Sequence, residues 1–317
     1  MIIKNRLIPI RIRQNEALIR RIPAAHSQRS TIEGDLAKRK AGYRGEQSLD
    51  YYLSHLPAKE FTILHDLRLF NGSTYFQIDT LILSPYFALI IEVKNILGTL
   101  LFDETFNLLI RTRDEKEEGF PNPLIQAKRQ KTQLKTWLIQ NLACRYTNRI
   151  SNWHKQPLYY LKTSADSTHV PFRVIHIQHL IEKIKFFKQS YPIEVITSRQ
   201  IKKISRALVI NHVPGFLNIL DHYNISSKEI ISGVQCPSCL IFPMRRIHGD
   251  WLCPQCGCKN KKAHLPAIQD YLLLISPAIS NKQARAFLHT ASEDTASRLL
   301  SVMPSSGTKK GRIYFLQ

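Results

Sequence analysis

Two apolar segments of this sequence decide its fold: YFQIDTLIL (75–83) and FALIIEVKN (87–95), joined through Ser84 and Pro85. Apolar residues occupy both alternating sides of these segments, so we expect two neighbouring strands inside a buried sheet, connected by a short turn. Asp79, Glu92 and Lys94 interrupt the apolar pattern. Because successive side chains of a strand alternate between faces, Glu92 and Lys94 point the same way, and the hairpin can bring Asp79 beside them.

Charged groups inside a buried sheet are costly unless they are paired, bind a ligand or lie at a cleft. One interpretation is structural: an exposed Asp79 and a Glu92–Lys94 pair on a half-buried strand. The other is metal-dependent hydrolysis of phosphodiester bonds. Asp79 and Glu92 would then supply hard oxygen ligands to Mg²⁺ or Mn²⁺, and Lys94 would position water and balance charge in the transition state. The buried setting favours hydrolysis.

The flanking sequence predicts an α/β arrangement. A capped helix is expected from Ser30 to just before Pro57, and a long basic helix from Leu124 to about Ala143. The charged run from Arg111 to Glu118 predicts a loop. Further strands are expected at FTILHDLRLF (61–70), GTLLFD (98–103), NLLIRTR (107–113), PLYYL (157–161), FRVIHI (172–177) and IEVIT (193–197), with a helix from Ser198 to Ala207 after them.

The order and spacing of Glu46, Asp79, Glu92 and Lys94 resemble those of the nuclease-related domain (NERD) of the PD-(D/E)xK nuclease superfamily. The resemblance covers residues 38–145 closely and extends loosely to residue 215. It implies a restriction-endonuclease-like α/β sandwich, in which helices flank a mixed central sheet. It rests on the segments GYRGE (42–46), QIDTLIL (77–83), IIEVKN (90–95), GTLLFD (98–103) and NPLIQAKRQ (122–130).

The resemblance implies two further site residues. Glu46, on the first core helix, would be another acidic group of the site. Gln126, at the start of the long helix, would contact water or phosphate. The alternatives, a carboxylate on the helix surface for Glu46 and an ordinary first-turn polar residue for Gln126, stay open at this point.

The chain is strongly basic. Its 317 residues include 45 Lys and Arg against 24 Asp and Glu, a formal net charge of +21. This surplus argues against an acidic or neutral metabolic enzyme and favours a polyanionic partner, because each cation that meets a phosphate releases a counterion. Residues 1–29 are either a polyanion-binding arm or a poorly tied terminus. We expect nucleic acid, with DNA favoured, to be held by Lys128, Arg129, Lys131, Arg245 and Arg246.

Four of the six cysteines form two CxxC pairs, Cys236 with Cys239 and Cys253 with Cys256, with thirteen residues between the pairs. Four thiolates in two short knuckles can close a tetrahedral Zn²⁺ site with no open position, which predicts a structural zinc. The segment resembles a zinc ribbon. Cys258 is a fifth sulfur that could compete with Cys256, and Trp251 either stacks on a base or packs over the zinc core.

We expect four parts: a basic arm (1–29), the NERD nuclease-like domain (30–225), the zinc ribbon (232–262) and a small helical region (265–317). The last part predicts two or three short helices, which form either a DNA-reading helix-turn-helix or a plain helical hairpin. Lys309, Lys310 and Arg312 give it a basic edge. Cys144 is expected to be a buried hydrophobe.

No run approaches the roughly 18 consecutive apolar residues that a membrane span needs. The N-terminus alternates apolar and basic residues without a cleavage site, which predicts a cytoplasmic protein. Its charge would suit a membrane surface, but no wide apolar face accompanies it. The sequence therefore predicts a metal-dependent nuclease with Mg²⁺ or Mn²⁺ at its active site and a structural Zn²⁺. The alternative is an inactive nucleic-acid-binding or recruitment protein that keeps the nuclease-like fold.

Overall fold

The computed structural model describes residues 1–103, 105–142, 154–162, 174–308 and 311–316, with the backbone alone for 154–162. The chain divides into two compact units. The first unit comprises Met1–Leu7 and Lys40–Gly215, and the second comprises Ile8–Arg39 and Phe216–Gln317. Cys144, Lys309 and Lys310 lie outside the described residues. The four-part division expected from the sequence stays a prediction.

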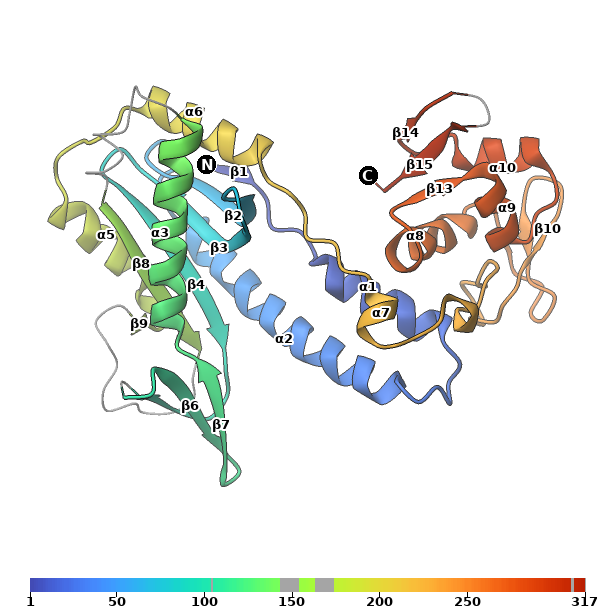
Figure 1. The fold of residues 1–317 in the computed structure, drawn as a ribbon, viewed down its shortest axis with the longest axis horizontal. Helices are drawn as coiled ribbons and strands as arrows, with labels where there is room; N and C mark the ends of the chain where they lie inside the picture. Colours follow the sequence, from blue (N-terminus) through green and yellow to red (C-terminus); the bar gives the residue numbers. More distant parts are fainter. Residues whose placement is uncertain (104, 143–153, 163–173, 309–310, 317) are drawn as a thin grey trace. The chain divides into compact units, whose positions relative to one another are not determined.

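The first unit is built on a six-stranded mixed sheet in the order β1-β2-β3-β4-β8-β9 (Figure 1). β2, β3 and β4 are antiparallel neighbours, whereas β1 runs parallel to β2, β8 parallel to β4 and β9 parallel to β8. The mixed sheet expected from the sequence is thereby confirmed. Its strands are Ile2–Lys4 (β1), Thr62–Phe70 (β2), Tyr75–Leu83 (β3), Phe87–Asn95 (β4), His154–Lys162 (β8) and Val174–Ile175 (β9).

Helices cover both faces of this sheet, as the two-sided apolar pattern of β3 and β4 requires. On one face, strand residues such as Leu81 and Ile90 form a buried cluster with α3 (Pro123–Asn141) and α6 (Ser198–Ile210). On the other face, residues such as Ile82 and Ile91 pack with the end of α2 (Arg29–Leu53) and with α5 (Leu180–Ser190). The strand alternation therefore sends neighbouring residues into two separate cores.

A second sheet of the first unit corrects one expectation. β5 (Thr99–Asp103), β6 (Leu108–Arg113) and β7 (Lys116–Pro121) form an antiparallel meander, so the charged run 111–118 is a hairpin and not a loop. Asp114 and Glu115 both have positive φ, 51° and 59°, as a two-residue turn between twisted strands demands. Opposite charges pair across the hairpin: Arg111 Nη2 donates to Glu118 Oε2 at 2.7 Å.

Two other strand predictions differ from the structure. Of the FRVIHI segment the structure describes residues 174–177, in which Val174–Ile175 form β9 and a 3₁₀ turn (Ile177–His179) begins at the last residue. IEVIT forms no strand. Its backbone instead binds the β3–β4 turn, because the N–H groups of Val195 and Ile196 donate to the Pro85 carbonyl at 2.9 and 3.2 Å. That connection fastens α6 against the sheet without extending it.

The first 29 residues are not a free arm. β1 joins the sheet, and α1 (Ile10–Arg21) belongs to the second unit, where it packs against α8. The side chains of Arg6 and Arg21 are only 2% and 1% exposed and form ion pairs with acidic residues. A buried, paired guanidinium cannot meet a polyanion, so the expectation of a binding arm is wrong for these two arginines.

The second unit has its own apolar core, formed by its helices around Trp251. Its zinc-ribbon segment carries a three-stranded sheet, β10-β11-β12. The expected short C-terminal helices are present, but three strands of two or three residues were missed. Its elements are α1, α7 (Ile219–His222), a 3₁₀ turn (Ser227–Glu229), β10 (Arg245–Arg246), β11 (Trp251–Leu252), β12 (Lys259–Asn260), α8 (His264–Leu274), β13 (Ala278–Ser280), α9 (Asn281–Leu288), α10 (Glu293–Leu300), β14 (Ser305–Ser306) and β15 (Ile313–Phe315).

The C-terminal helices are more than a helical hairpin. α9 and α10 are joined by the four residues 289–292, and the strand pair β14–β15 follows them. β15 also pairs with β13, which precedes α9, so the sheet order is β13-β15-β14. This is the arrangement of a winged helix-turn-helix. None of the helices in the described parts of the chain combines the length and apolarity that crossing a bilayer demands.

Candidate active site and zinc site

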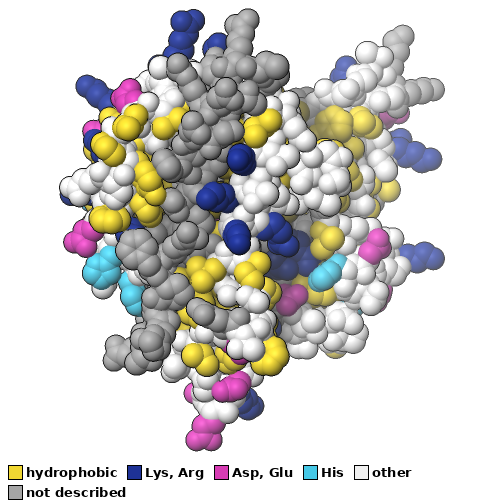
Figure 2. All heavy atoms as spheres, turned by 60° about the vertical axis from the view of Figure 1, so that its left-hand side comes forward, with side chains coloured by type: hydrophobic (Ala, Val, Ile, Leu, Met, Phe, Trp, Pro, Cys, Tyr) yellow, Lys and Arg dark blue, Asp and Glu magenta, His cyan; other side chains and the backbone are white. Residues whose placement is uncertain are grey.

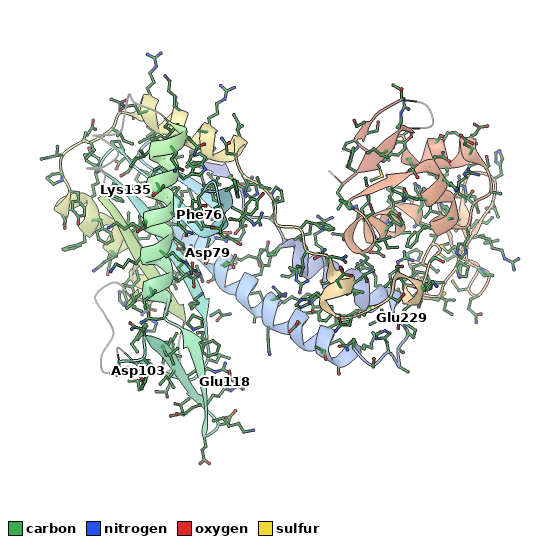
Figure 3. All side chains as sticks on the ribbon, viewed as in Figure 1. Phe76, Asp79, Asp103, Glu118, Lys135 and Glu229 are labelled. Atoms are coloured by element: carbon green, nitrogen blue, oxygen red, sulfur yellow. The ribbon has the colours of Figure 1, made fainter. Side chains whose placement is uncertain are left out.

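Asp79 on β3 and Glu92 and Lys94 on β4 lie together on adjacent strands. The antiparallel register pairs Thr80 with Ile91, and one further step places Asp79 across from Glu92. Lys94 Nζ donates to Glu92 Oε1 at 2.7 Å, and the Val93 N–H donates to Asp79 Oδ2 at 3.2 Å. Figure 3 shows Asp79 on the strand that runs beside α3. The structure therefore brings the three charged residues of the apolar strands into one cluster.

Helix α3 supplies two amides that hold Glu92 in place. Gln126 Nε2 donates to Glu92 Oε1 at 2.5 Å, and Gln130 Nε2 donates to Glu92 Oε2 at 2.9 Å. Gln126 Oε1 also accepts from Lys94 Nζ at 3.2 Å. Asn122 caps this helix by accepting the Leu124 N–H at 2.9 Å, which fixes the first turn from which Gln126 projects. Gln130 was missed, although its spacing of four from Gln126 puts both on one helix face.

Glu46 projects from α2 and is held by an arginine from outside the motif. Arg6 Nη1 donates to Glu46 Oε2 at 2.8 Å and to Asp66 Oδ1 at 3.2 Å. Its other nitrogens bond Asp50 at 3.3 Å and Thr80 Oγ1 at 3.0 Å. One buried guanidinium thus ties α2 to β2 and β3. No sequence pattern points to Arg6, because its partners lie at least 40 residues away along the chain.

The GYRGE segment needs one of its two glycines for packing. A Cβ at Gly45 would lie 2.6 Å from Asn95 Cβ, whereas a Cβ at Gly42 would meet no atom within 4 Å. Asn95 Nδ2 donates to the Ala41 carbonyl at 2.7 Å. Gly45 therefore lets α2 approach the end of β4, directly after Lys94, and this approach sets the position of Glu46.

The acidic side chains of the site disfavour one another's ionisation. Burial raises the pKa of Asp79 well above its usual 3.8, and the charges of Glu92 and Glu46 raise it further against the Val93 N–H and Lys94. Burial also raises the pKa of Glu46 to about 7, with Asp66 and Glu92 adding to the rise and Arg6 opposing it. A divalent cation bound beside these carboxyls would favour their ionised forms and lower both pKa values.

Mg²⁺ in proteins is usually bound by one or two carboxylates, with waters and substrate phosphates completing its octahedron. Asp79 and Glu92 fit this description, since they offer two hard oxygen groups on neighbouring strands. Within the described residues, only the four ribbon cysteines bring three or more His, Cys or acidic ligand atoms within 4.8 Å of one another. A metal held by Asp79 and Glu92 would therefore need water or substrate oxygens to complete its coordination.

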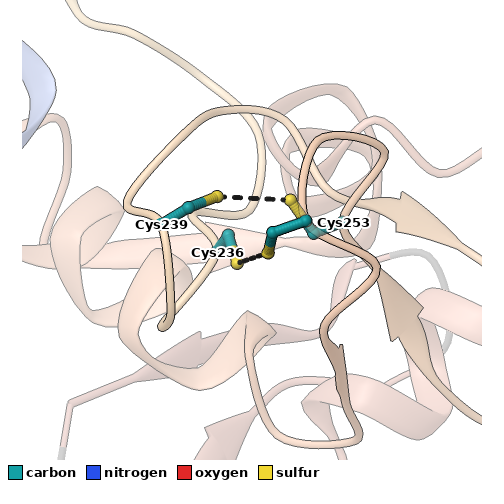
Figure 4. Close-up of side chains that lie close together, drawn as sticks. Cys236, Cys239 and Cys253 are labelled. Atoms are coloured by element: carbon teal, nitrogen blue, oxygen red, sulfur yellow. Dashed lines mark hydrogen bonds between the residues drawn. The ribbon is translucent and has the colours of Figure 1, made fainter.

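The four cysteines form a compact thiol cluster. Their Sγ atoms all lie within 4.8 Å of one another, and two pairs, Cys236–Cys256 and Cys239–Cys253, are 3.6 and 3.5 Å apart (Figure 4). Zn–S bonds of about 2.3 Å in a tetrahedron put the sulfurs about 3.8 Å apart, so these thiols are spaced to hold zinc. Cys258 does not belong to this group of closely spaced thiols.

Backbone N–H groups favour thiolates in this cluster. Burial opposes ionisation of Cys236, but the N–H groups of Cys239 and Ser238 lower the pKa of its thiol to about 6. The Cys256 N–H likewise lowers the pKa of Cys253. For Cys239 the Ile241 N–H acts in the same direction, but burial and the neighbouring thiols raise its pKa to about 12. Four sulfurs at this spacing cannot all carry charge without a cation.

The basic residues predicted to contact nucleic acid differ in exposure. On α3, Lys128 and Arg129 are exposed and Lys131 is half-buried. In the ribbon segment, Arg245 is exposed, while Arg246 is half-buried with its guanidinium carbon 5.3 Å from the Trp251 ring centroid. Figure 2 shows Lys and Arg side chains gathered in the middle of the face it draws. The contacts of the five predicted lysines and arginines with nucleic acid stay predictions.

Trp251 cannot stack on a base. Its side chain is 0% exposed and lies in the core of the second unit. Its Nε1–H donates to His264 Nδ1 at 3.3 Å, which satisfies the buried indole donor. The packing alternative for this residue is therefore correct.

Loss of zinc is expected to unfold the ribbon segment, because the core around Cys236 and Cys253 depends on it. We expect the purified protein to contain one zinc per chain by elemental analysis. Cys253→Ser is expected to lose that zinc and at least ~3 kcal/mol of stability in the second unit, since structural zinc contributes directly to folding. The matched variant Cys258→Ser is expected to retain it. Equal zinc loss from both variants would contradict the four-cysteine assignment.

The Glu46 carboxyl is expected to titrate near pH 7 when divalent cations are absent. Its folded pKa exceeds the usual 4.5, so its protonated form stabilises the fold below pH 4.5 and that stability is lost as the pH rises through 7. NMR titration of ¹³C-labelled glutamate, assigned with Glu46→Gln, measures this midpoint. Arg6→Gln should raise it further because a cation is removed. A midpoint near 4.5, or a fall in Arg6→Gln, would contradict these electrostatics.

Comparison with known proteins gives a family match for the part of the chain that carries this site. Residues 41–161 match the family model described as nuclease-related domain, NERD. No curated protein and no solved structure gives a significant match. The matched range includes Glu46, Asp79, Glu92, Lys94 and Gln126, whereas Arg6 and the cysteine cluster lie outside it. Residues 41–161 of this chain therefore match the nuclease-related domain family, NERD.

Proposed function

We propose that this protein hydrolyses phosphodiester bonds of nucleic acid, with DNA as the favoured substrate, in a reaction that depends on Mg²⁺ or Mn²⁺. One observation carries the proposal: Glu92, Lys94 and Gln126 form a hydrogen-bonded cluster, and Asp79, which accepts the Val93 N–H, lies across from Glu92 on the neighbouring strand of a segment that matches a nuclease-related domain. An intact set of two acids and a lysine favours turnover over binding alone.

Asp79 and Glu92 are the residues that would hold the metal. When bound there, the ion would polarise the scissile phosphate and lower the pKa of a bound water. Gln126 and Gln130 fix both oxygens of Glu92 from one side, so the carboxylate cannot rotate away when substrate arrives. This preorganisation supports the assignment, because a catalytic electrostatic group contributes most when it needs no rearrangement.

Lys94 is placed to act on water or on phosphate. Its ammonium donates one hydrogen to Glu92 and one to Gln126, which accounts for two of its three N–H groups among the described residues. The third can donate to the attacking water or to a phosphate oxygen. The charge of Lys94 would also balance the negative charge that develops on the phosphate.

Glu46 is a candidate for proton transfer. Its pKa of about 7 lets it accept or release a proton near neutral pH, the condition that suits a general acid or base. Its charge raises the pKa of Asp79, so the protonation of one carboxyl would affect the other. Arg6 holds Glu46 on one oxygen, Oε2, so Oε1 is the oxygen that would exchange a proton with water.

Basic residues would hold the nucleic acid at this site. Lys128 and Arg129 lie two and three residues after Gln126 on α3, and Lys131 lies five residues after it. The formal net charge of +21 supports binding to a phosphate backbone. In the second unit, Arg245 and Arg246 would add contacts from the ribbon segment, while the zinc itself keeps that segment folded.

Cleavage of plasmid and linear DNA, with RNA as a third substrate, is the test. We expect cleavage with Mg²⁺ or Mn²⁺ that EDTA abolishes, and a loss of at least ~100-fold in rate for Asp79→Asn and for Lys94→Ala. The matched controls are Asp114→Asn and Lys59→Ala, which change exposed residues of the same unit.

The controls are expected to cleave at the wild-type rate. Cleavage that survives both Asp79→Asn and Lys94→Ala would overturn the proposed site. Metal-independent cleavage, or salt-sensitive binding with no cleavage under any divalent metal, would overturn the proposed reaction and leave a nucleic-acid-binding protein.

A further inference from the structure

A cavity of about 450 Å³ opens next to the acidic cluster, between the start of β3 and helix α3. Two of its lining residues, Gln126 and Gln130, are the amides that hold Glu92. The cavity therefore shares side chains with the proposed catalytic site and is next to it. Figure 3 shows Phe76 on β3, the same strand that carries Asp79. Its other walls include Tyr75, Phe76, Gln77 and Arg129.

One buried acceptor at this cavity lacks a partner. Gln130 is 4% exposed, and its Nε2 donates to Glu92 Oε2 at 2.9 Å. Because a carboxylate can only accept, this bond fixes the orientation of the amide and directs Oε1 elsewhere. Oε1 is buried without a hydrogen-bond partner in the described part of the chain. Leaving such an acceptor unsatisfied is unfavourable, and because the atom is closed to solvent a ligand would reach it only after the Gln130 side chain shifts.

The remaining walls suit a flat ring. Tyr75 is 47% exposed, and the Arg68 guanidinium carbon lies 3.8 Å from its ring centroid, with the Phe70 ring at 5.0 Å. These contacts hold the tyrosine ring in place before any ligand binds. Phe76 is buried and provides an apolar wall. Gln77 and Arg129 add polar groups that make no side-chain hydrogen bond among the described residues.

We propose that this cavity binds the base of a nucleotide adjacent to the scissile phosphate. Aromatic stacking with hydrogen bonds from amides to the base edge is how proteins hold unpaired bases, and Gln77 offers such an amide at an exposed position in the cavity wall. The volume falls in the usual range of about 300–1,000 Å³ for ligand sites. Arg129 would bind the phosphate of the same nucleotide. The inference rests on the proposed function and gives it a substrate class.

The consequence is a preference for unpaired nucleic acid. A base can enter the cavity only after leaving its stack and its pairing partner, which costs a few kcal/mol in an intact duplex. Single strands, frayed ends and mismatched sites avoid that cost. We therefore assign single-stranded or locally unpaired DNA as the preferred substrate of the acidic cluster.

Binding without added Mg²⁺ or Mn²⁺, where no cleavage is expected, tests this preference without relying on catalysis and leaves the structural zinc in place. The probe is a labelled single-stranded 12-nucleotide DNA, compared by fluorescence anisotropy with the same strand carrying abasic sites throughout and with its duplex. We expect the full-length protein to bind the base-containing strand at least about 10-fold tighter than the abasic strand, since stacking contributes about 1–3 kcal/mol per base. The duplex should bind more weakly than the single strand.

Two lining variants and one matched control complete the design. Tyr75→Ala and Gln77→Ala, both at exposed positions, are expected to weaken binding of the base-containing strand, Tyr75→Ala by about 5-fold or more, and to leave the abasic strand unchanged. Tyr51→Ala removes a tyrosine that is 67% exposed on α2 and does not line the cavity. It is expected to change neither affinity.

Equal affinities for the base-containing and abasic strands would overturn the inference and leave a phosphate-binding surface. So would a Tyr75→Ala effect of the same size on both strands. These outcomes are separable from failure of the proposed function. Base-dependent binding without cleavage under any metal would overturn the nuclease reaction alone, and cleavage without base-dependent binding would overturn the cavity alone.

Discussion

The structure of the first unit depends on the burial of one carboxylate. Glu92 lies in the most apolar strand of the sheet with its side chain 3% exposed, so both of its oxygens must find donors. Lys94 supplies one donor from the same strand, and α3 supplies two amides. The position of α3 on the sheet therefore depends on the hydrogen bonds of Gln126 and Gln130 with Glu92, as well as on the apolar contacts of the helix with the core. The same amides line the neighbouring cavity, so substrate binding and metal binding would act on shared side chains.

A second constraint is charge balance, and it operates in both units. In the first, burial and neighbouring carboxylates raise the pKa values of Asp79 and Glu46, and the cations that approach them, Lys94 and Arg6, do not compensate fully. In the second, four thiols stand at the spacing of zinc ligands, with N–H groups lowering the pKa of two of them. Each cluster is an anionic site whose charge a divalent cation would neutralise. The chemistry differs because carboxylates at an open site leave positions for water and phosphate, whereas four thiolates close the zinc site.

The sequence allowed the central strands, the three charged residues and the cysteine pairs to be predicted, because each depends on local spacing. Arg6 could not be predicted, since its contacts with Glu46 and Asp66 exist only after the N-terminus packs beside β2. The hairpin at 111–118 was mistaken for a loop because charge dominates its composition, while its strands are stabilised by pairing of opposite charges. For Trp251 the sequence allowed both stacking and packing, with packing the commoner role, and the core of the second unit encloses it. Strands of two residues, such as β14, carry too short a pattern to be recognised.

The central claim is that Asp79 and Glu92 form a divalent cation site. The most direct measurement is Mn²⁺ binding by the full-length, zinc-loaded protein, followed through the electron paramagnetic resonance signal of free Mn²⁺. Our account predicts a Mn²⁺ site in the wild-type chain that is lost in Asp79→Asn and kept in Asp114→Asn, with Mg²⁺ competing for it. Equal Mn²⁺ binding by Asp79→Asn and the wild type, or no Mn²⁺ binding by the wild type, would contradict it.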